Sequence, residues 1–212
     1  MRLVWRHVVV GTKNSWLHGD PRGFRSRDHR LHSSGDYKEP PPCGEHAGLL
    51  RYHQRNAGEP VDLGVEARIQ VCRAFVLKWQ SLGYRVIVCS VGERHLHAVL
   101  EGPEDYGQLG KEVGKCKQKA SHAVRHLLPS SIWAANGGFK PIRGRGHFRN
   151  SYTYVRTRQE AGTVVWSHRP DEDWIADETV GVVLMRGKGQ TPDRLLPKPA
   201  SEGTPEDPDS LG

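Results

Sequence analysis

Two histidines stand one residue apart in the segment CSVGERHLHAVLE at positions 89–101. Side chains two positions apart on a strand project from the same face, so His95 and His97 point together while the apolar residues between and after them point the other way. Two imidazoles side by side on a sheet can bind one divalent cation. A half-buried pair of hydrogen-bonded histidines is the alternative, and the motif alone leaves both interpretations open.

The surrounding sequence predicts the sheet that would hold this pair. Residues 84–91 and 95–101 are rich in β-branched and apolar side chains, and the short turn between them predicts an antiparallel hairpin. The other expected elements, in chain order, are a strand at 3–10, helices at 65–82 and 104–128, a strand near 139–142, a helix at 148–161 and a short strand or extended segment at 163–166. Antiparallel strands with helices packed on them indicate an α+β fold.

Composition divides the chain into one domain and two C-terminal segments. We expect a domain at 1–170 with a long basic loop at about 15–62, a weakly structured extension at 171–189, and a disordered, acidic, proline-rich tail at 190–212. The formal net charge is +7, and because the tail is acidic the rest of the chain is more basic still. This surplus favours phosphate-rich partners. A basic protein without a polyanionic partner is equally compatible with it.

The cysteines and the apolar runs bear on location. Cys43, Cys72, Cys89 and Cys116 are widely spaced and form no CxxC pair, which predicts free thiols in a reducing compartment. No apolar run approaches the roughly 18 residues of a membrane span, and the N-terminus has too few contiguous apolar residues for a signal sequence. We therefore expect a cytoplasmic protein without a membrane partner.

Three stretches together resemble the single-tyrosine HUH transposases, of the REP-associated and insertion-sequence kind. They are SWLHGDPRGF at 15–24, YRVIVCSVGERHLHAVLE at 84–101, and IWAANGG at 132–138 followed by YVRTRQEAG at 154–162. Their order and spacing agree with the family over about residues 3–167. The resemblance implies a ferredoxin-like or RRM-like HUH fold.

The resemblance also implies an activity. In such proteins a tyrosine hydroxyl attacks a DNA phosphate, leaving a 5′-phosphotyrosine link and a free 3′-OH, and the reverse attack joins a new end. Mg²⁺ or Mn²⁺ held by the histidines polarises the phosphate. The expected partners are single-stranded, hairpin-forming DNA and a second copy of the chain, so the implied function is DNA transposition.

The resemblance assigns Tyr154 as the nucleophile, with Tyr152 as its competitor. Residues two apart on a helix face about 200° apart, so only one of the two can point into the site. The implied metal ligands are His95, His97 and Gln159. The family position one turn after the tyrosine holds Arg158, which cannot ligate a cation, and the glutamine follows it.

Several arginines are expected to contact DNA, most of them in loops beside the site: Arg22, Arg25, Arg27, Arg94, Arg143, Arg145, Arg149 and Arg158. Arg158 could clamp the scissile phosphate. Trp16, Trp133 and Phe139 could stack bases, with core packing as the alternative. Arg94 replaces an asparagine that is usual in the family. Two other hypotheses are therefore a host-adopted copy that binds DNA without cutting it, and a metal hydrolase with a water nucleophile.

Overall fold

A computed structural model describes residues 2–24, 32–34, 41–128, 131–168, 182–184 and 193–195. The elements in chain order are β1 (Leu3–Thr12), α1 (Ala47–Ala57), α2 (Val65–Ser81), β2 (Val86–Val91), β3 (His95–Pro103), α3 (Tyr106–Ala123), β4 (Trp133–Pro141), α4 (Gly144–Thr157), β5 (Val164–Ser167), β6 (Val182–Leu184) and β7 (Asp193–Leu195). Two of the arginines expected to contact DNA, Arg25 and Arg27, lie outside the described residues.

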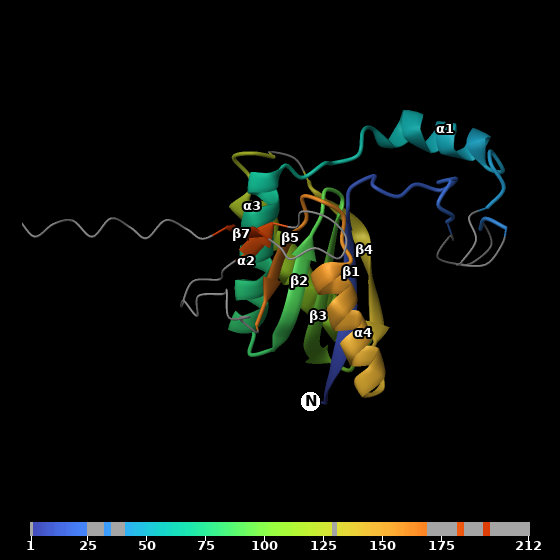
Figure 1. Cartoon of the computed structure of the whole chain (residues 1–212). Coiled ribbons are helices and arrows are strands. Elements are labelled where there is room, and N and C mark those ends of the chain that lie inside the picture. The colour runs from blue at the N-terminus through green and yellow to red at the C-terminus, as the bar shows by residue number, and fades with distance from the viewer. Residues whose placement is uncertain are drawn as a thin grey trace, which may run out of the picture.

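All strands join one antiparallel sheet in the order β4-β1-β3-β2-β5-β6-β7 (Figure 1). The unit β1-α2-β2-β3-α3-β4, with its strands in the order β4-β1-β3-β2, is the split βαβ arrangement of ferredoxin-like folds. The expected antiparallel α+β fold is therefore confirmed.

Helices α2 and α3 cover one face of the sheet, and the main core lies between these helices and the sheet. Alternation along β1 and β3 sends fully buried Val8, Val10, Leu96 and Leu100 to this face. Burying one such side chain contributes about 1.5–3 kcal/mol. On α2, Trp79 is fully buried and its indole N–H donates a 2.9 Å hydrogen bond to a carbonyl of β3.

Helix α4 covers part of the opposite face (Figure 1). A smaller apolar cluster forms there from Val88 on β2, Val99 on β3, Val155 on α4 and Val165 on β5. The same alternation that buries Leu96 on the far side turns the histidines of β3 toward α4. The sheet is thus a rigid platform with a helix layer on each side.

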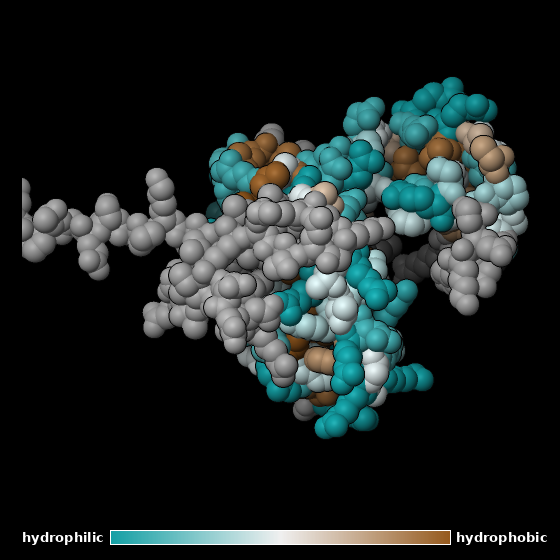
Figure 2. Space-filling view, in the orientation of Figure 1, coloured by the Kyte–Doolittle hydropathy of each residue, from teal (hydrophilic) through white to brown (hydrophobic). Residues whose placement is uncertain are grey.

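The loop expected at 15–62 contains helix α1, which the sequence analysis missed. This helix buries no residue and has no side-chain cap, so neither a run of core residues nor capping marks it. It stands away from the sheet, and its surface is mostly hydrophilic (Figures 1 and 2). Gly19, at φ +90°, packs against it so closely that a Cβ would lie 2.5 Å from the backbone nitrogen of Leu50. The ring of His18 lies 5.4 Å from Phe24 and 5.2 Å from His53. The segment SWLHGDPRGF at 15–24 therefore has a structural role, because it packs its loop against α1.

Several other elements differ from their expected bounds, among them helix α3, which ends at Ala123 rather than 128. Strand β4 begins at Trp133 rather than near 139, and pairs Gly137 and Gly138 with β1. A Cβ at Gly137 would lie 3.0 Å from a carbonyl oxygen of β1, which explains a glycine inside a strand. Helix α4 begins at Gly144 rather than 148 and ends at Thr157 rather than 161.

Strands β6 and β7 extend the sheet where we expected a weakly structured extension and a disordered tail. The rest of 171–189 and of 190–212 lies outside the described residues. Cys72, Cys89 and Cys116 are buried free thiols, and Cys43 is an exposed one. No helix in the described part of the chain combines the length and apolar character that crossing a membrane requires.

Candidate active site

Three imidazoles lie side by side on the sheet face that α4 partly covers. The rings of His95 and His97, both on β3, have centroids 4.8 Å apart. Strand β1 adds His7, because its register places Val9 opposite His97 and His7 opposite Val99 on the same face. The His7 ring lies 5.2 Å from the His97 ring, with its Nε2 3.1 Å from Nδ1 of His97. The third imidazole extends the expected pair into a row.

Helix α4 brings Tyr154 to this row. Its ring centroid lies 5.6 Å from that of His97 and 6.0 Å from that of His7. The residue is 41% exposed, which leaves it accessible to a polymer. Tyr152 points to the other side of the helix, where its hydroxyl lies 2.9 Å from the hydroxyl of Ser167. The two tyrosines diverge as the helical geometry requires.

Gln159 reaches the site because α4 ends before it. Arg158 is the C-cap, so the chain leaves the helix and returns the glutamine toward the sheet. Its side chain is almost fully buried, and its Nε2 donates a 2.8 Å hydrogen bond to the carbonyl of Tyr154. It is also a hydrogen-bond partner of His95. The glutamine thus links the end of the tyrosine helix to the histidine pair.

Burial keeps the three imidazoles neutral at physiological pH. Desolvation lowers the pKa of His97 to about 3, helped by the neighbouring His95 and His7. Desolvation lowers the pKa of His7 to about 4, helped by the charge of Lys140. The pKa of His95 is also lowered by burial, against an opposing effect of the Glu160 carboxylate. A neutral imidazole keeps the lone pair that a metal or a hydrogen bond needs.

The donors that could hold a divalent ion are the imidazoles of His95 and His97 and the amide oxygen of Gln159. Among the described residues, no three His, Cys, Asp or Glu side chains converge as a metal site, and ligation by His95, His97 and Gln159 stays a prediction. Nδ1 of His97 faces His7, so Nε2 would be the ligating atom of this residue. The hydroxyl of Ser90, directly opposite His97 in the sheet register, is buried without a hydrogen-bond partner in the described structure. An orphaned hydroxyl beside neutral imidazoles fits a site that takes up a further polar group.

Two of the expected DNA-contacting arginines form ion pairs that hold loops together. Arg94 pairs with Asp62, with Nη2 3.0 Å from Oδ2. Arg22 lies 2.6 Å from Asp20 and stacks with its guanidinium 4.2 Å from the centre of the Trp16 ring. Both arginine side chains remain about half exposed. A DNA contact from either stays a prediction.

The arginines expected in the later loop, Arg143, Arg145 and Arg149, lie instead at the N-cap of α4 or on the helix, because the helix starts earlier than expected. Arg158, expected on the helix one turn after the tyrosine, is its C-cap. Arg145 and Arg149 line a pocket on the side of α4 away from Tyr154. They therefore do not face the histidines.

The three aromatic residues that could stack on bases differ in how far they are exposed. Trp133 is 9% exposed and its indole N–H donates to the carbonyl of Lys117, so it belongs to the core. The ring of Phe139 packs 5.0 Å from that of Tyr106. Trp16 is 56% exposed, and base stacking at this residue stays a prediction.

Sequence reasoning missed His7 and Ser90. The parity of the strand at 3–10 places His7 on a face shared with Trp5 and Val9, but parity does not say which neighbouring strand lies beside it. Ser90 precedes the turn of the hairpin, and the observed register, with Val91 opposite Leu96 and Ser90 opposite His97, differs by one residue from the register that a three-residue turn at 92–94 predicts. Both residues can be assigned to the site once the strand register is known.

No protein-family model and no curated protein matches this sequence. Among solved structures, the chain is similar to one described as a REP-associated tyrosine transposase bound to a REP hairpin, with a TM-score of 0.40 and 12% sequence identity. The similarity covers 72% of this chain and 64% of that chain, so this chain spans just under two thirds of the length of that transposase.

Proposed function

We propose that this protein cleaves and rejoins DNA strands through a covalent phosphotyrosine, with Tyr154 as the nucleophile. The observation that supports the proposal most is the position of Tyr154, whose ring lies 5.6 Å from that of His97 in a row of neutral imidazoles. The ferredoxin-like sheet and the resemblance of three sequence stretches to HUH transposases agree with it. The substrate we propose is single-stranded, hairpin-forming DNA, as in transposition.

The reaction conserves the energy of the phosphodiester bond. The Tyr154 hydroxyl oxygen attacks phosphorus, the bond from phosphorus to the 3′ oxygen breaks, and the phenolic proton is lost while the 3′ oxygen gains one. A 3′-OH attacking the phosphotyrosine reverses these changes, so no nucleotide cofactor is consumed. A Mg²⁺ or Mn²⁺ ion held by His95, His97 and Gln159 would offset negative charge on the reacting phosphate.

The side chains around Tyr154 support this role by holding it in place. Gln159 donates a hydrogen bond to the Tyr154 carbonyl and is also a hydrogen-bond partner of His95 on β3, which ties the end of α4 to the sheet. Val155, the next residue along, is fully buried in the cluster under the helix. These two contacts anchor the helix and position the phenol of Tyr154 while leaving it partly exposed. A nucleophile for a bulky substrate needs this arrangement.

An adduct assay tests the proposal. Wild-type protein is incubated with Mn²⁺ and a pool of labelled single-stranded DNAs that share a hairpin and differ in flanking sequence, and SDS-resistant complexes are counted on a gel. Tyr154→Phe is expected to abolish the adduct, and His97→Ala to reduce it at least about 100-fold. Tyr152→Phe, which removes one hydroxyl from the same helix, is the matched control and should retain it.

Three outcomes would overturn the proposal. Equal adduct from Tyr154→Phe would remove that tyrosine from the chemistry. DNA binding without any adduct would point to a non-catalytic DNA-binding protein, and cleavage that survives loss of both tyrosines would point to a metal hydrolase with a water nucleophile. We also propose a homodimer, which light scattering should detect as twice the chain mass of 23.8 kDa.

A further inference from the structure

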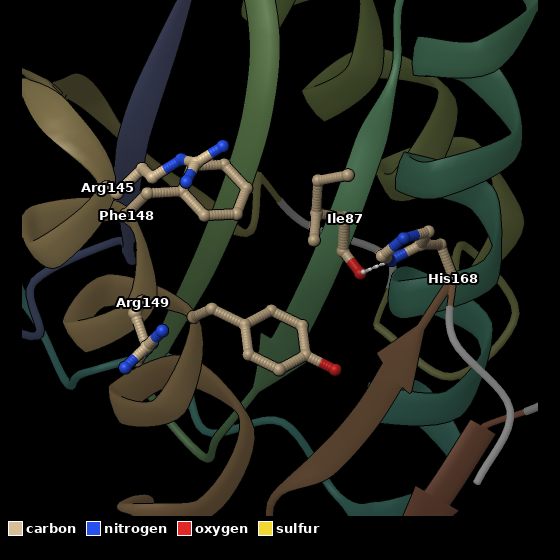
Figure 3. A pocket seen from close by; sticks show the side chains of 6 residues that line it. Ile87, Arg145, Phe148, Arg149 and His168 are labelled. Atoms are coloured by element: carbon tan, nitrogen blue, oxygen red, sulfur yellow. Dashed lines mark hydrogen bonds between the residues drawn. The ribbon is translucent and has the colours of Figure 1, made fainter.

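A pocket lies on the side of α4 away from Tyr154, between that helix and strands β2 and β5 (Figure 3). Its volume is about 480 Å³, within the range of pockets that hold small ligands. The described residues that line it are Ile87, Arg145, Phe148, Arg149, Tyr152 and His168. None of them belongs to the candidate active site.

Helix α4 separates the two sites by its periodicity. Arg145, Arg149 and Tyr152 are spaced by four and three residues and so share one side of the helix. Tyr154 lies about 200° around the axis from Tyr152. A strand whose phosphate reaches Tyr154 would need to pass around α4 to reach this pocket.

Two exposed arginines lie at the rim of the pocket. Arg145 and Arg149 are exposed, and neither forms an ion pair or hydrogen bond with any described residue. Elsewhere the exposed Arg85 pairs with Glu101 at 2.7 Å. No carboxylate is among the described lining residues. Two guanidiniums one helical turn apart can bind the oxygens of one phosphate together.

The inner wall carries aromatic rings that are already fixed in place. Phe148 packs edge-on against Trp5, with ring centroids 5.2 Å apart and planes at 80°. The hydroxyl of Tyr152 is held 2.9 Å from that of Ser167. Rings that need no further ordering lose little entropy when a flat ligand packs on them.

The opposite wall offers one hydrogen-bond acceptor. Nδ1 of His168 lies 3.0 Å from the carbonyl oxygen of Ile87, and since a carbonyl can only accept, Nδ1 carries the proton (Figure 3). In the neutral ring Nε2 then has a free lone pair. Cations at the rim, aromatic rings within and an acceptor opposite them match the phosphate, the flat base and the amino group of a nucleotide.

We propose that this pocket binds one unpaired nucleotide of the single strand that leads to or from the cleavage site. Its phosphate lies on Arg145 and Arg149, its base packs against Phe148 and Tyr152, and His168 accepts a hydrogen bond from an amino or ring N–H group of the base. The inference rests on the proposed function, because it takes the ligand to be the same DNA strand.

Binding without cleavage tests this pocket separately from the chemistry. All measurements use protein carrying Tyr154→Phe, which cannot form the adduct, and a fluorescent six-nucleotide single strand of mixed sequence. Arg145→Ala with Arg149→Ala is expected to weaken binding at least about 10-fold. The slope of log affinity against log salt should shrink by about 0.7, because the two arginines bind one phosphate and each phosphate contact on a single strand accounts for about 0.7.

A charge-matched control and an abasic ligand separate the pocket from general electrostatics. Lys111→Ala with Lys119→Ala removes two exposed charges from α3, on the other face of the sheet, and should leave affinity within about twofold. Tyr152→Leu should weaken binding of the normal strand about 5- to 160-fold, the range for one stacked base, and Tyr152→Phe, which keeps the ring but loses its hydroxyl contact with Ser167, should weaken it less. Neither Tyr152 variant should change binding of a strand with abasic sites.

Several results would overturn the inference. These are undetectable binding by the parent protein, unchanged affinity in the double arginine variant, an equal loss in the lysine control, or equal affinity of the parent for normal and abasic strands. If the protein binds the strands as expected here but forms no adduct, the proposed nucleotide pocket stands and the proposed nuclease activity is refuted. If it forms the adduct but the arginine and tyrosine variants bind as the parent does, the nuclease activity stands and the pocket is refuted.

Discussion

Replacing His7 with phenylalanine tests whether this ring fixes the protonation of a metal ligand. Nε2 of His7 lies 3.1 Å from Nδ1 of His97, a residue that is only 9% exposed. An ion bound at Nε2 of His97 requires the proton on Nδ1, and His7 is placed to accept it. Phenylalanine keeps a ring in the same place but offers no acceptor.

The magnitude follows from what the variant leaves unpaired. Without an ion, His97 can move its proton to the other nitrogen and so avoid a buried N–H without a partner. With an ion bound, the proton must stay on Nδ1, and a buried unsatisfied donor costs about 1–3 kcal/mol. At about 1.4 kcal/mol per tenfold, Mn²⁺ affinity should fall about 10- to 100-fold, the range seen when such partners of metal-ligating histidines are lost.

Calorimetric titration of Mn²⁺ into DNA-free protein measures this loss without relying on activity. His7→Gln, which restores an oxygen acceptor, should lose less affinity than His7→Phe. His122→Phe, a change at an exposed histidine of α3 on the other face of the sheet, should lose none. Equal affinities for wild type and His7→Phe would refute the reasoning, and so would an equal loss in the His122 control. Thermal melting of each variant separates metal binding from misfolding.

Two further outcomes follow from burial and backbone geometry. Without metal, folding lowers the pKa of His97 to about 3 and that of His7 to about 4, so the unfolded chain takes up these protons first. The contribution of these two neutral histidines to the free energy of unfolding is present above about pH 6.5 and is lost as the pH falls, by about 2 kcal/mol per histidine between pH 7 and pH 5. Urea unfolding in EDTA measures this loss, and a free energy of unfolding that does not change with pH would contradict it. Gly19→Ala places a Cβ 2.5 Å from the nitrogen of Leu50 at φ +90°. Proteolysis within 15–24 should accelerate while the main unfolding midpoint stays unchanged, and unchanged proteolysis would exclude the packing role of this glycine.

Periodicity alone predicted the elements that carry the core. The apolar spacing of α2 and α3 and the alternation of β1, β2 and β3 are strong because each element buries one face. The shared face of His95 and His97 followed from the same alternation. The divergence of Tyr152 from Tyr154 followed from helix geometry.

The sequence could not give the features that depend on tertiary contacts. Helix α1 buries nothing, and β4 contains glycines that a strand pattern does not expect; the one at Gly137 is explained by its approach to β1. His7 becomes part of the site only through strand register. Gln159 reaches His95 only because α4 ends at Thr157, and element ends are set by local capping that this sequence marks weakly.

Mapping the covalent bond tests the central claim most directly. Trypsin cleavage after Arg149 and Arg156 releases one peptide with both Tyr152 and Tyr154, and fragmentation of that peptide in a mass spectrometer locates any attached nucleotide. After incubation with Mn²⁺ and hairpin DNA, we predict a 5′-phosphonucleotide on Tyr154 that is absent when EDTA replaces the ion. A nucleotide found on Tyr152, or on Tyr154 in equal amount with EDTA, would contradict the account.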